Sequence, residues 1–187
     1  TIPALCVLEA KIKVLGPEGS RELPVSELLK PCAACLNHDE MTVKSCFYGI
    51  PAGKKTVLGP GELITEIIIP EMKGNYQVAY EKTGRKQMGC MSRFTLAAAV
   101  SKDNGRILDL RLSIGAAFAD IQLLRQECAP FAGSRPSRED IGKLSCLLSQ
   151  KILAQVKKEN DNIRYKSMVC ERLCYRTLCQ LIFGEEP

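Results

Sequence analysis

Four side chains that bind metals in other proteins lie within fifteen residues of one another: Cys32, Cys35, His38 and Cys46. Thiolates and imidazole are the usual ligands of structural zinc, and a structural zinc site normally supplies them as two pairs of residues that are close in sequence. Here the fourth ligand stands alone, and His38 is the only histidine in the chain. The segment 30–48 is therefore open to three interpretations: a Cys/His metal-binding module, a redox site or an irregular surface insertion. The spacing favours the insertion.

A basic segment from Lys82 to Cys90 is the second candidate. It holds three cations (Lys82, Arg85 and Lys86) and two glycines, and it has no apolar period. Most charged connections of this kind are solvated loops on the surface. The alternative is a loop that contacts an anion or a cofactor and is held in place by a rigid sheet.

The sheet that must position this loop is predicted from three runs of alternating residues between Tyr76 and Ala116. Alternation with a period of two indicates strands with one buried face. Asn104 and Gly105 tolerate the backbone of a tight hairpin turn, so the second and third strands should pair. The residues expected on the buried faces are Tyr76, Val78 and Tyr80, then Phe94, Leu96, Ala98 and Val100, then Leu108, Leu110, Leu112 and Ile114.

The remaining elements suggest an α+β fold, in which C-terminal helices cover a small antiparallel sheet. A short helix is expected from Leu123 to Ala132. Ser137 and Asp140 form a capping-box pattern before the next helix, and Ser167 is expected to open the last one. Residues 10–15, 21–24 and 62–69 read as strands. Two domains are predicted, covering residues 1–70 and 75–187.

Composition limits the function classes. A formal charge of +5 and the absence of Trp do not indicate nucleic acid binding, and no apolar run is long enough for a membrane span. The ten cysteines sit in otherwise ordinary core-forming segments. We expect Cys146, Cys170, Cys174 and Cys179 to be buried, reduced thiols of a cytoplasmic protein. The chain starts Thr1-Ile2-Pro3, so we expect its true beginning to lie upstream.

Three segments together resemble the FAD-binding medium subunit of the molybdenum hydroxylases, a family that includes xanthine dehydrogenase and carbon monoxide dehydrogenase. The segments are Pro3 to Leu15, then Gly53 to Ile67 with the phrase GKKTVLGPGELITEI, then Ala79-Tyr80-Glu81-Lys82. Their order and spacing are typical of that family. The resemblance covers most of the chain apart from residues 30–46.

The resemblance implies an oxidoreductase subunit that holds FAD. Iron–sulfur clusters and molybdopterin would lie on partner subunits, and the flavin would pass electrons to NAD or another acceptor. By position, Leu58 matches a family leucine near the flavin ring, and Lys82 matches the lysine that starts the adjacent loop. Arg85 and Lys86 could meet the phosphates of a nicotinamide dinucleotide.

The sequence also departs from the family. The glycine-rich segments that bind the pyrophosphate of FAD would precede Thr1, so most of the FAD site is expected there. A Ser-x-x-Tyr-Arg pattern of the closing helix is degenerate at Ser167. Two alternatives therefore remain beside the flavoprotein: a non-catalytic domain that docks partner subunits without flavin, and the Cys/His metal-binding module.

Overall fold

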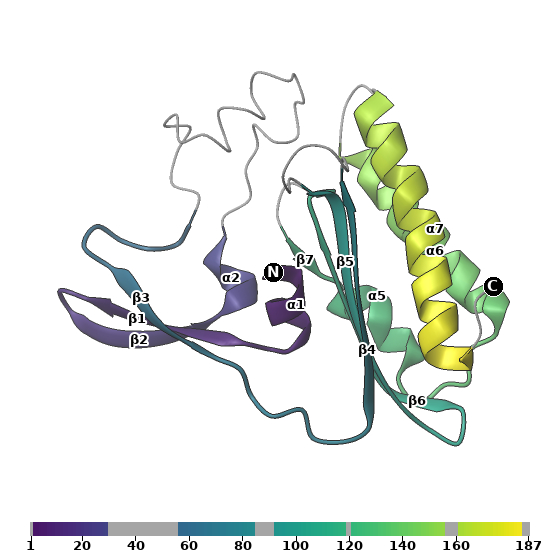
Figure 1. Ribbon diagram of the computed structural model, residues 1–187, viewed down its shortest axis with the longest axis horizontal. Coiled ribbons are helices and arrows are strands. Elements are labelled where there is room, and N and C mark those ends of the chain that lie inside the picture. The colour runs from purple at the N-terminus through teal and green to yellow at the C-terminus, as the bar shows by residue number, and fades with distance from the viewer. Residues whose placement is uncertain (1, 30–55, 85–91, 119–120, 156–160, 185–187) are drawn as a thin grey trace.

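The computed structural model describes residues 2–29, 56–84, 92–118, 121–155 and 161–184. These residues form two antiparallel sheets, which we call the small sheet (β2-β1-β3) and the large sheet (β4-β5-β6-β7). Figure 1 shows four layers: the small sheet, the short helices α1 and α2, the large sheet, and the long helices α6 and α7. This arrangement confirms the α+β fold predicted from the sequence.

The element bounds are as follows. The first part comprises α1 (Ile2–Val7), β1 (Lys11–Gly16), β2 (Gly19–Pro24), α2 (Val25–Leu28) and β3 (Leu63–Ile68). The large sheet comprises β4 (Tyr76–Gly84), β5 (Ser92–Asp103), β6 (Arg106–Gly115) and β7 (Gln122–Leu123). The helical part comprises α5 (Arg125–Cys128), the 3₁₀ helix η1 (Ala129–Phe131), α6 (Arg138–Ala154) and α7 (Asp161–Phe183).

The main core lies between the large sheet and the long helices. Phe94, Leu96 and Leu112 of the sheet are fully buried there. From α7, the buried stripe includes Cys170 and Cys174, which behave as small apolar residues. The cysteines of the described residues are free thiols. Of the four cysteines expected to be buried in the helices, Cys170, Cys174 and Cys179 are buried. Cys146 is only half-buried.

The predicted alternation of the third strand fails at one end. Leu108 is 55% exposed, whereas Ile107 is fully buried. The pairing of β5 with β6 shifts between Ser101 and Lys102, so that Leu108 is skipped in the register. Such a bulge inserts one residue and moves the following side chains to the other face. The turn at Asn104 and Gly105 is confirmed, and both residues have positive φ.

The predicted face of β4 was also wrong. Val78 and Tyr80 are 61% and 46% exposed, and Ala79 instead packs against the core beneath the helices. The register places Tyr76, Val78 and Tyr80 opposite Ser101, Ala99 and Ala97 of β5. These side chains therefore share the face of the large sheet that looks toward α1.

The helical part differs from prediction in two places. Residues 122–131 form a two-residue strand, one turn of α-helix and one 3₁₀ turn, in place of a single helix. α7 begins at Asp161, and Ser167 is buried inside it, where its Oγ lies 2.7 Å from the Oγ of Ser149 on α6. The capping box of Ser137 and Asp140 is present as predicted and starts α6.

Candidate functional site

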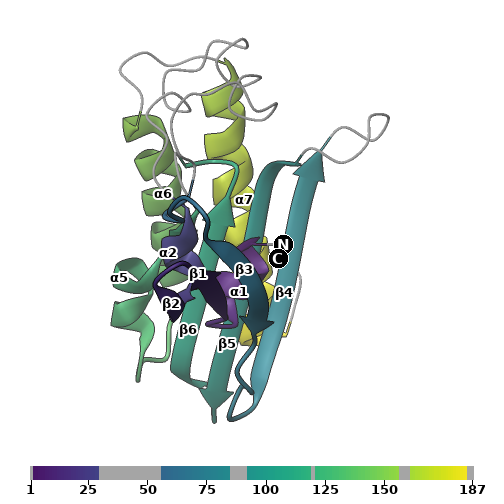
Figure 2. The same cartoon turned by 90° about the vertical axis from the view of Figure 1, so that its left-hand side faces the viewer.

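Helix α1 joins the two sheets, because its two sides pack into different hydrophobic clusters. Cys6 belongs to the cluster of the small sheet, together with Ile12 and Val14. Val7 belongs to a cluster with Ala97 and Ala99 on the large sheet. Figure 1 shows α1 between the small sheet and the large sheet, and in Figure 2, seen from the side of the small sheet, α1 overlaps β5 and β6. Side chains near α1 are thus well placed to form a site from both parts of the chain.

A glycine permits the close approach of α1 to the large sheet. A Cβ atom built on Gly115 would lie 2.8 Å from Cγ of Pro3 in α1 and 2.6 Å from Oγ1 of Thr95 in β5. Real Cβ atoms do not approach other heavy atoms so closely. Gly115 therefore sets the distance between the helix and β6.

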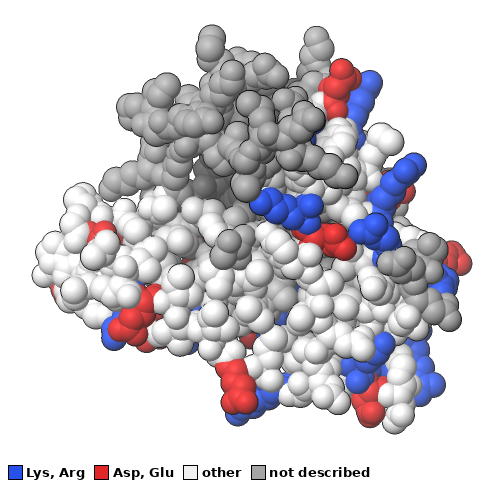
Figure 3. All heavy atoms as spheres, in the orientation of Figure 1, with Lys and Arg blue, Asp and Glu red and all other residues white. Residues whose placement is uncertain are grey.

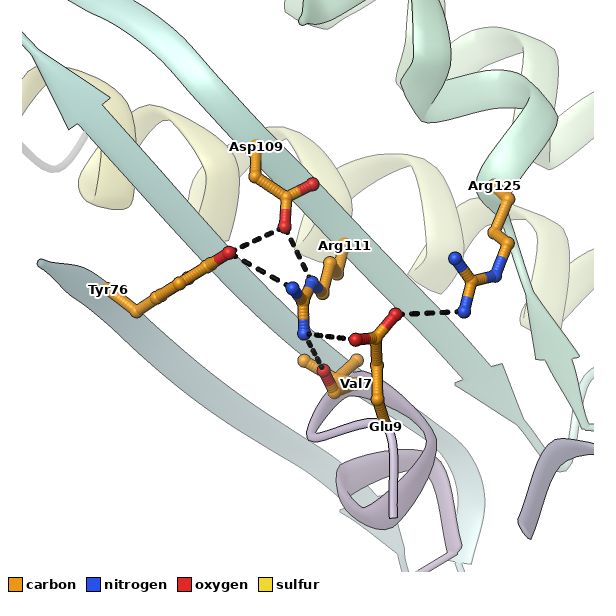
Figure 4. Close-up of polar contacts among 6 residues, drawn as sticks. All are labelled: Val7, Glu9, Tyr76, Asp109, Arg111 and Arg125. Carbon is orange, nitrogen blue, oxygen red and sulfur yellow. Dashed lines mark hydrogen bonds and ion pairs between the residues drawn. The ribbon is translucent and has the colours of Figure 1, made fainter. Parts of the chain in front are cut away.

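A polar network ties the end of α1 to β6 (Figure 4). The Nε of Arg111 donates to Oδ2 of Asp109 at 2.6 Å, and its Nη2 donates to the hydroxyl of Tyr76 at 3.0 Å. The Tyr76 hydroxyl in turn donates to the same Oδ2 at 2.7 Å. Nη1 of Arg111 reaches the carbonyl of Val7 at 3.4 Å and Oε2 of Glu9 at 3.3 Å.

Glu9 has an unusual backbone conformation for a residue that is not glycine. Its φ is +53°, in the left-handed region that favours glycine after a helix. Its carboxylate pairs with Arg111 and also with Nη2 of Arg125 at 2.9 Å. The glutamate therefore spans α1, β6 and α5, which glycine could not do.

The network shifts the pKa values of its members in a consistent direction. Burial alone would raise the pKa of Asp109, but the hydrogen bonds from Tyr76 and Arg111 outweigh it and lower that pKa. Burial and the bond to Asp109 raise the pKa of the Tyr76 phenol. The network thus holds an ionised carboxylate and a neutral phenol at neutral pH.

An open pocket of about 330 Å³ lies beside this network, and residues of β6, β7 and α5 line it. Its charged residues are balanced, with two carboxylates and two guanidinium groups that already pair with one another. The Cys128 thiol is inert there, because burial and the nearby Glu127 carboxylate raise its pKa to about 12. The lining residues are Glu9, Asp109, Leu110, Arg111, Leu112, Leu123, Leu124, Arg125, Cys128, Ala129 and Ala132.

The two residues expected to contact flavin lie in different parts of the fold: Leu58 in the loop before β3, and Lys82 on β4. Leu58 is partly buried against the core of the small sheet, the cluster that includes Cys6 of α1. Lys82 is exposed on β4 and lies opposite Thr95, on the α1 side of the large sheet. Val78, Tyr80 and Lys82 therefore alternate along one exposed strip of β4. Both positions border the layer that contains α1. That one flavin contacts both Leu58 and Lys82 stays a prediction.

Several predicted site residues lie outside the described residues: Cys32, Cys35, His38, Cys46, Arg85 and Lys86. Within the described residues, no cluster of His, Cys, Asp and Glu suited to a metal ion is found. None of the described helices has the length and apolar character needed to cross a membrane. On the face drawn in Figure 3, the described cations and carboxylates lie interspersed.

Sequence reasoning missed the polar network. Asp109, Arg111 and Ser113 alternate with apolar residues, which suggested a solvent-facing side of the strand. In the structure α1 covers that side, so that Ser113 is fully buried and the Arg111 side chain is only 22% exposed. The available signal was the spacing of Asp109 and Arg111, since residues two apart on a strand share a face.

No protein-family model matches the chain. Solved structures do share its fold. A structure of quinoline 2-oxidoreductase from Pseudomonas putida 86 superposes on 98% of the chain with a TM-score of 0.70 and 14% identity. A Cu,Mo-CO dehydrogenase in its cyanide-inactivated form matches 98% of the chain with a TM-score of 0.73 and 18% identity.

A third structure is carbon monoxide dehydrogenase from Hydrogenophaga pseudoflava lacking the Mo-pyranopterin moiety of its cofactor. It matches 100% of the chain with a TM-score of 0.73 and 17% identity. The chain spans 55%, 57% and 56% of the three matched chains, respectively. At these identities the similarity establishes the fold. The chain therefore has the fold of about half of each matched quinoline 2-oxidoreductase or CO dehydrogenase chain, and this agrees with the fold expected from the sequence resemblance.

Proposed function

We propose that the chain is part of the FAD-binding subunit of a molybdenum hydroxylase. In this role the subunit relays electrons from iron–sulfur clusters through flavin to NAD or another acceptor, while molybdopterin is held on a partner subunit. One observation carries the proposal. The similarity to CO dehydrogenase and quinoline 2-oxidoreductase runs through 98–100% of the chain, so it includes both sheets and the closing helices.

The exposed strip of β4 suits a flavin chemically. Val78 and Tyr80 offer apolar and aromatic surface that remains 61% and 46% exposed, and Lys82 adds an ammonium group on the same face. FAD, when bound, supplies a ring that accepts and releases electrons. The strip would pack against the ring, and Leu58 would approach it from the small sheet. The rest of the FAD site would come from polypeptide outside this chain.

Lys82 would act by electrostatics. A cation about 4 Å from a unit negative charge gains about 1 kcal/mol in bulk water and about 4 kcal/mol at an effective dielectric constant near 20. Lys82 is exposed in this chain. Its effect therefore depends on a ligand or another polypeptide that covers it and excludes water.

The test uses the intact assembly, purified from the organism that makes this chain. We expect bound FAD, and we expect Lys82→Ala to slow flavin reduction or to lower the flavin potential without loss of the fold. Lys143→Ala is the matched control, because Lys143 is an exposed lysine of α6 that pairs with Glu139 of its own helix. Equal flavin kinetics in the two variants would refute the role of Lys82.

The second candidate is a non-catalytic domain that docks partner subunits. It is favoured by half-exposed aliphatic side chains on the small sheet, such as Leu63 at 68% and Ile67 at 56% exposure. An intact assembly that contains this chain and no flavin would support it over the flavoprotein.

A further inference from the structure

Within the described part of the chain, strand β3 forms an open edge of the small sheet. Among the described strands it pairs only with β1, so its outer row of backbone N–H and C=O groups has no strand beside it. Such an edge is a ready template for another strand. β3 has the sequence LITEII, and its only charge, Glu66, is paired with Lys13 of β1 at 3.1 Å.

The opposite edge of the same sheet is protected in ways that β3 is not. β2 contains Arg21, Glu22 and Pro24, and all three are exposed. Arg21 is fixed by two hydrogen bonds to Glu62, at 2.8 and 2.9 Å. Charges and proline are devices by which edge strands avoid pairing. The sheet therefore blocks one edge and leaves the other apolar.

The core beneath β3 is also incomplete. Ile67 lies directly opposite Ile12 in the register, and Ile12 is buried in the cluster of the small sheet. Side chains opposite each other in a sheet point to the same face. Ile67 thus points to the core side, yet it is 56% exposed, and Ile69 just beyond it is 53% exposed. A further strand and its side chains would cover both.

We propose that the outer edge of β3 pairs with a β-strand of the polypeptide that makes up the rest of the matched fold. More than two fifths of each matched chain has no counterpart here, because this chain spans only 55–57% of them. The inference rests on the proposed function for the identity of that polypeptide. The pairing itself rests on the open edge and on the uncovered Ile67.

Hydrogen exchange in the intact assembly provides the first test. We expect peptides that cover residues 63–68 to exchange at least tenfold more slowly than those that cover residues 19–24, the other edge of the same sheet. Equal exchange at the two edges would overturn the proposal.

A pair of variants provides the second test. Ile67→Lys places a charge on the core face of β3, beside the added strand, and Met168→Lys is the control, because Met168 is 58% exposed on α7. We expect Ile67→Lys to reduce the yield of intact assembly at least tenfold and Met168→Lys to leave it unchanged. Similar yields would contradict the docking edge. A dimer of this chain in native mass spectrometry that the Ile67→Lys substitution dissociates would also contradict the proposal, because β3 would then pair with a second copy.

Flavin is measured on the same preparations, so that the two proposals can fail separately. A protected β3 in a flavin-free assembly contradicts the flavin function and supports the docking edge. A flavin-loaded assembly in which β3 exchanges as fast as β2 contradicts the docking edge alone.

Discussion

Arg111 joins parts of the chain that are 104 positions apart, because its guanidinium contacts the carbonyl of Val7 while its other nitrogens hold Asp109 and Tyr76. A cation–π contact also holds Arg111 against Tyr76, since the guanidinium carbon lies 5.1 Å from the centre of the Tyr76 ring. Arg111 therefore fixes α1, and with it the small sheet, against the large sheet.

We predict that Arg111→Met lowers the free energy of unfolding by about 1.5–3 kcal/mol, the usual range for lost hydrogen bonds to charged groups. Arg125→Met is the matched control in the same network. The Arg125 side chain is 70% exposed and pairs with Glu9 at the surface, so we expect a loss below about 1 kcal/mol. Urea unfolding measures both. Equal losses would contradict the central position of Arg111.

The carboxyl of Asp109 makes stability depend on pH. Its pKa is lower in the folded chain than its ordinary value, so the folded state favours the ionised form. That stabilisation is present above about pH 4 and is lost as the pH falls below it. We predict that Asp109→Asn lowers stability at pH 7 and flattens its decline between about pH 5 and pH 3. An unchanged acid profile in the variant would argue against the network.

Among the contacts between elements, Gly115 controls how closely α1 packs on the large sheet. An alanine Cβ would press on Pro3 and Thr95 at 2.8 and 2.6 Å. We predict that Gly115→Ala costs about 1–3 kcal/mol, as overpacking usually does. Gly142→Ala in α6 is the contrast, because its Cβ would meet only Tyr175 at 3.9 Å. There we expect a gain of about 0.5–1 kcal/mol. Thermal unfolding tests whether Gly115→Ala lowers the stability and Gly142→Ala raises it.

Elements were predictable from the sequence where a short-range rule decides them. The hairpin at Asn104 and Gly105 and the cap of α6 follow from local chemistry, and both are present. The bulge that buries Ile107 and exposes Leu108 was not predictable, since it depends on pairing with β5. The start of α7 was missed because Ser167 resembles a cap, whereas it bonds across to Ser149 of α6.

At the scale of the whole molecule, the sequence predicted the α+β fold, since strand periods and the order of the motifs span much of the chain. It did not predict that α1 covers the second face of the large sheet. That contact joins residues about a hundred positions apart and depends on Gly115 and Arg111. The face of β4 was misassigned for the same reason, because only tertiary packing decides which side of an edge strand stays open.

The central claim is that a flavin lies between the two sheets and touches both Leu58 and Lys82. A structure of the intact assembly with FAD bound tests it most directly, through the distances from the flavin ring to these two side chains. We predict that atoms of both side chains lie within about 4.5 Å of the ring, the limit of van der Waals contact. A ring that contacts only one of them, or that lies away from the α1 side of β4, would contradict the account.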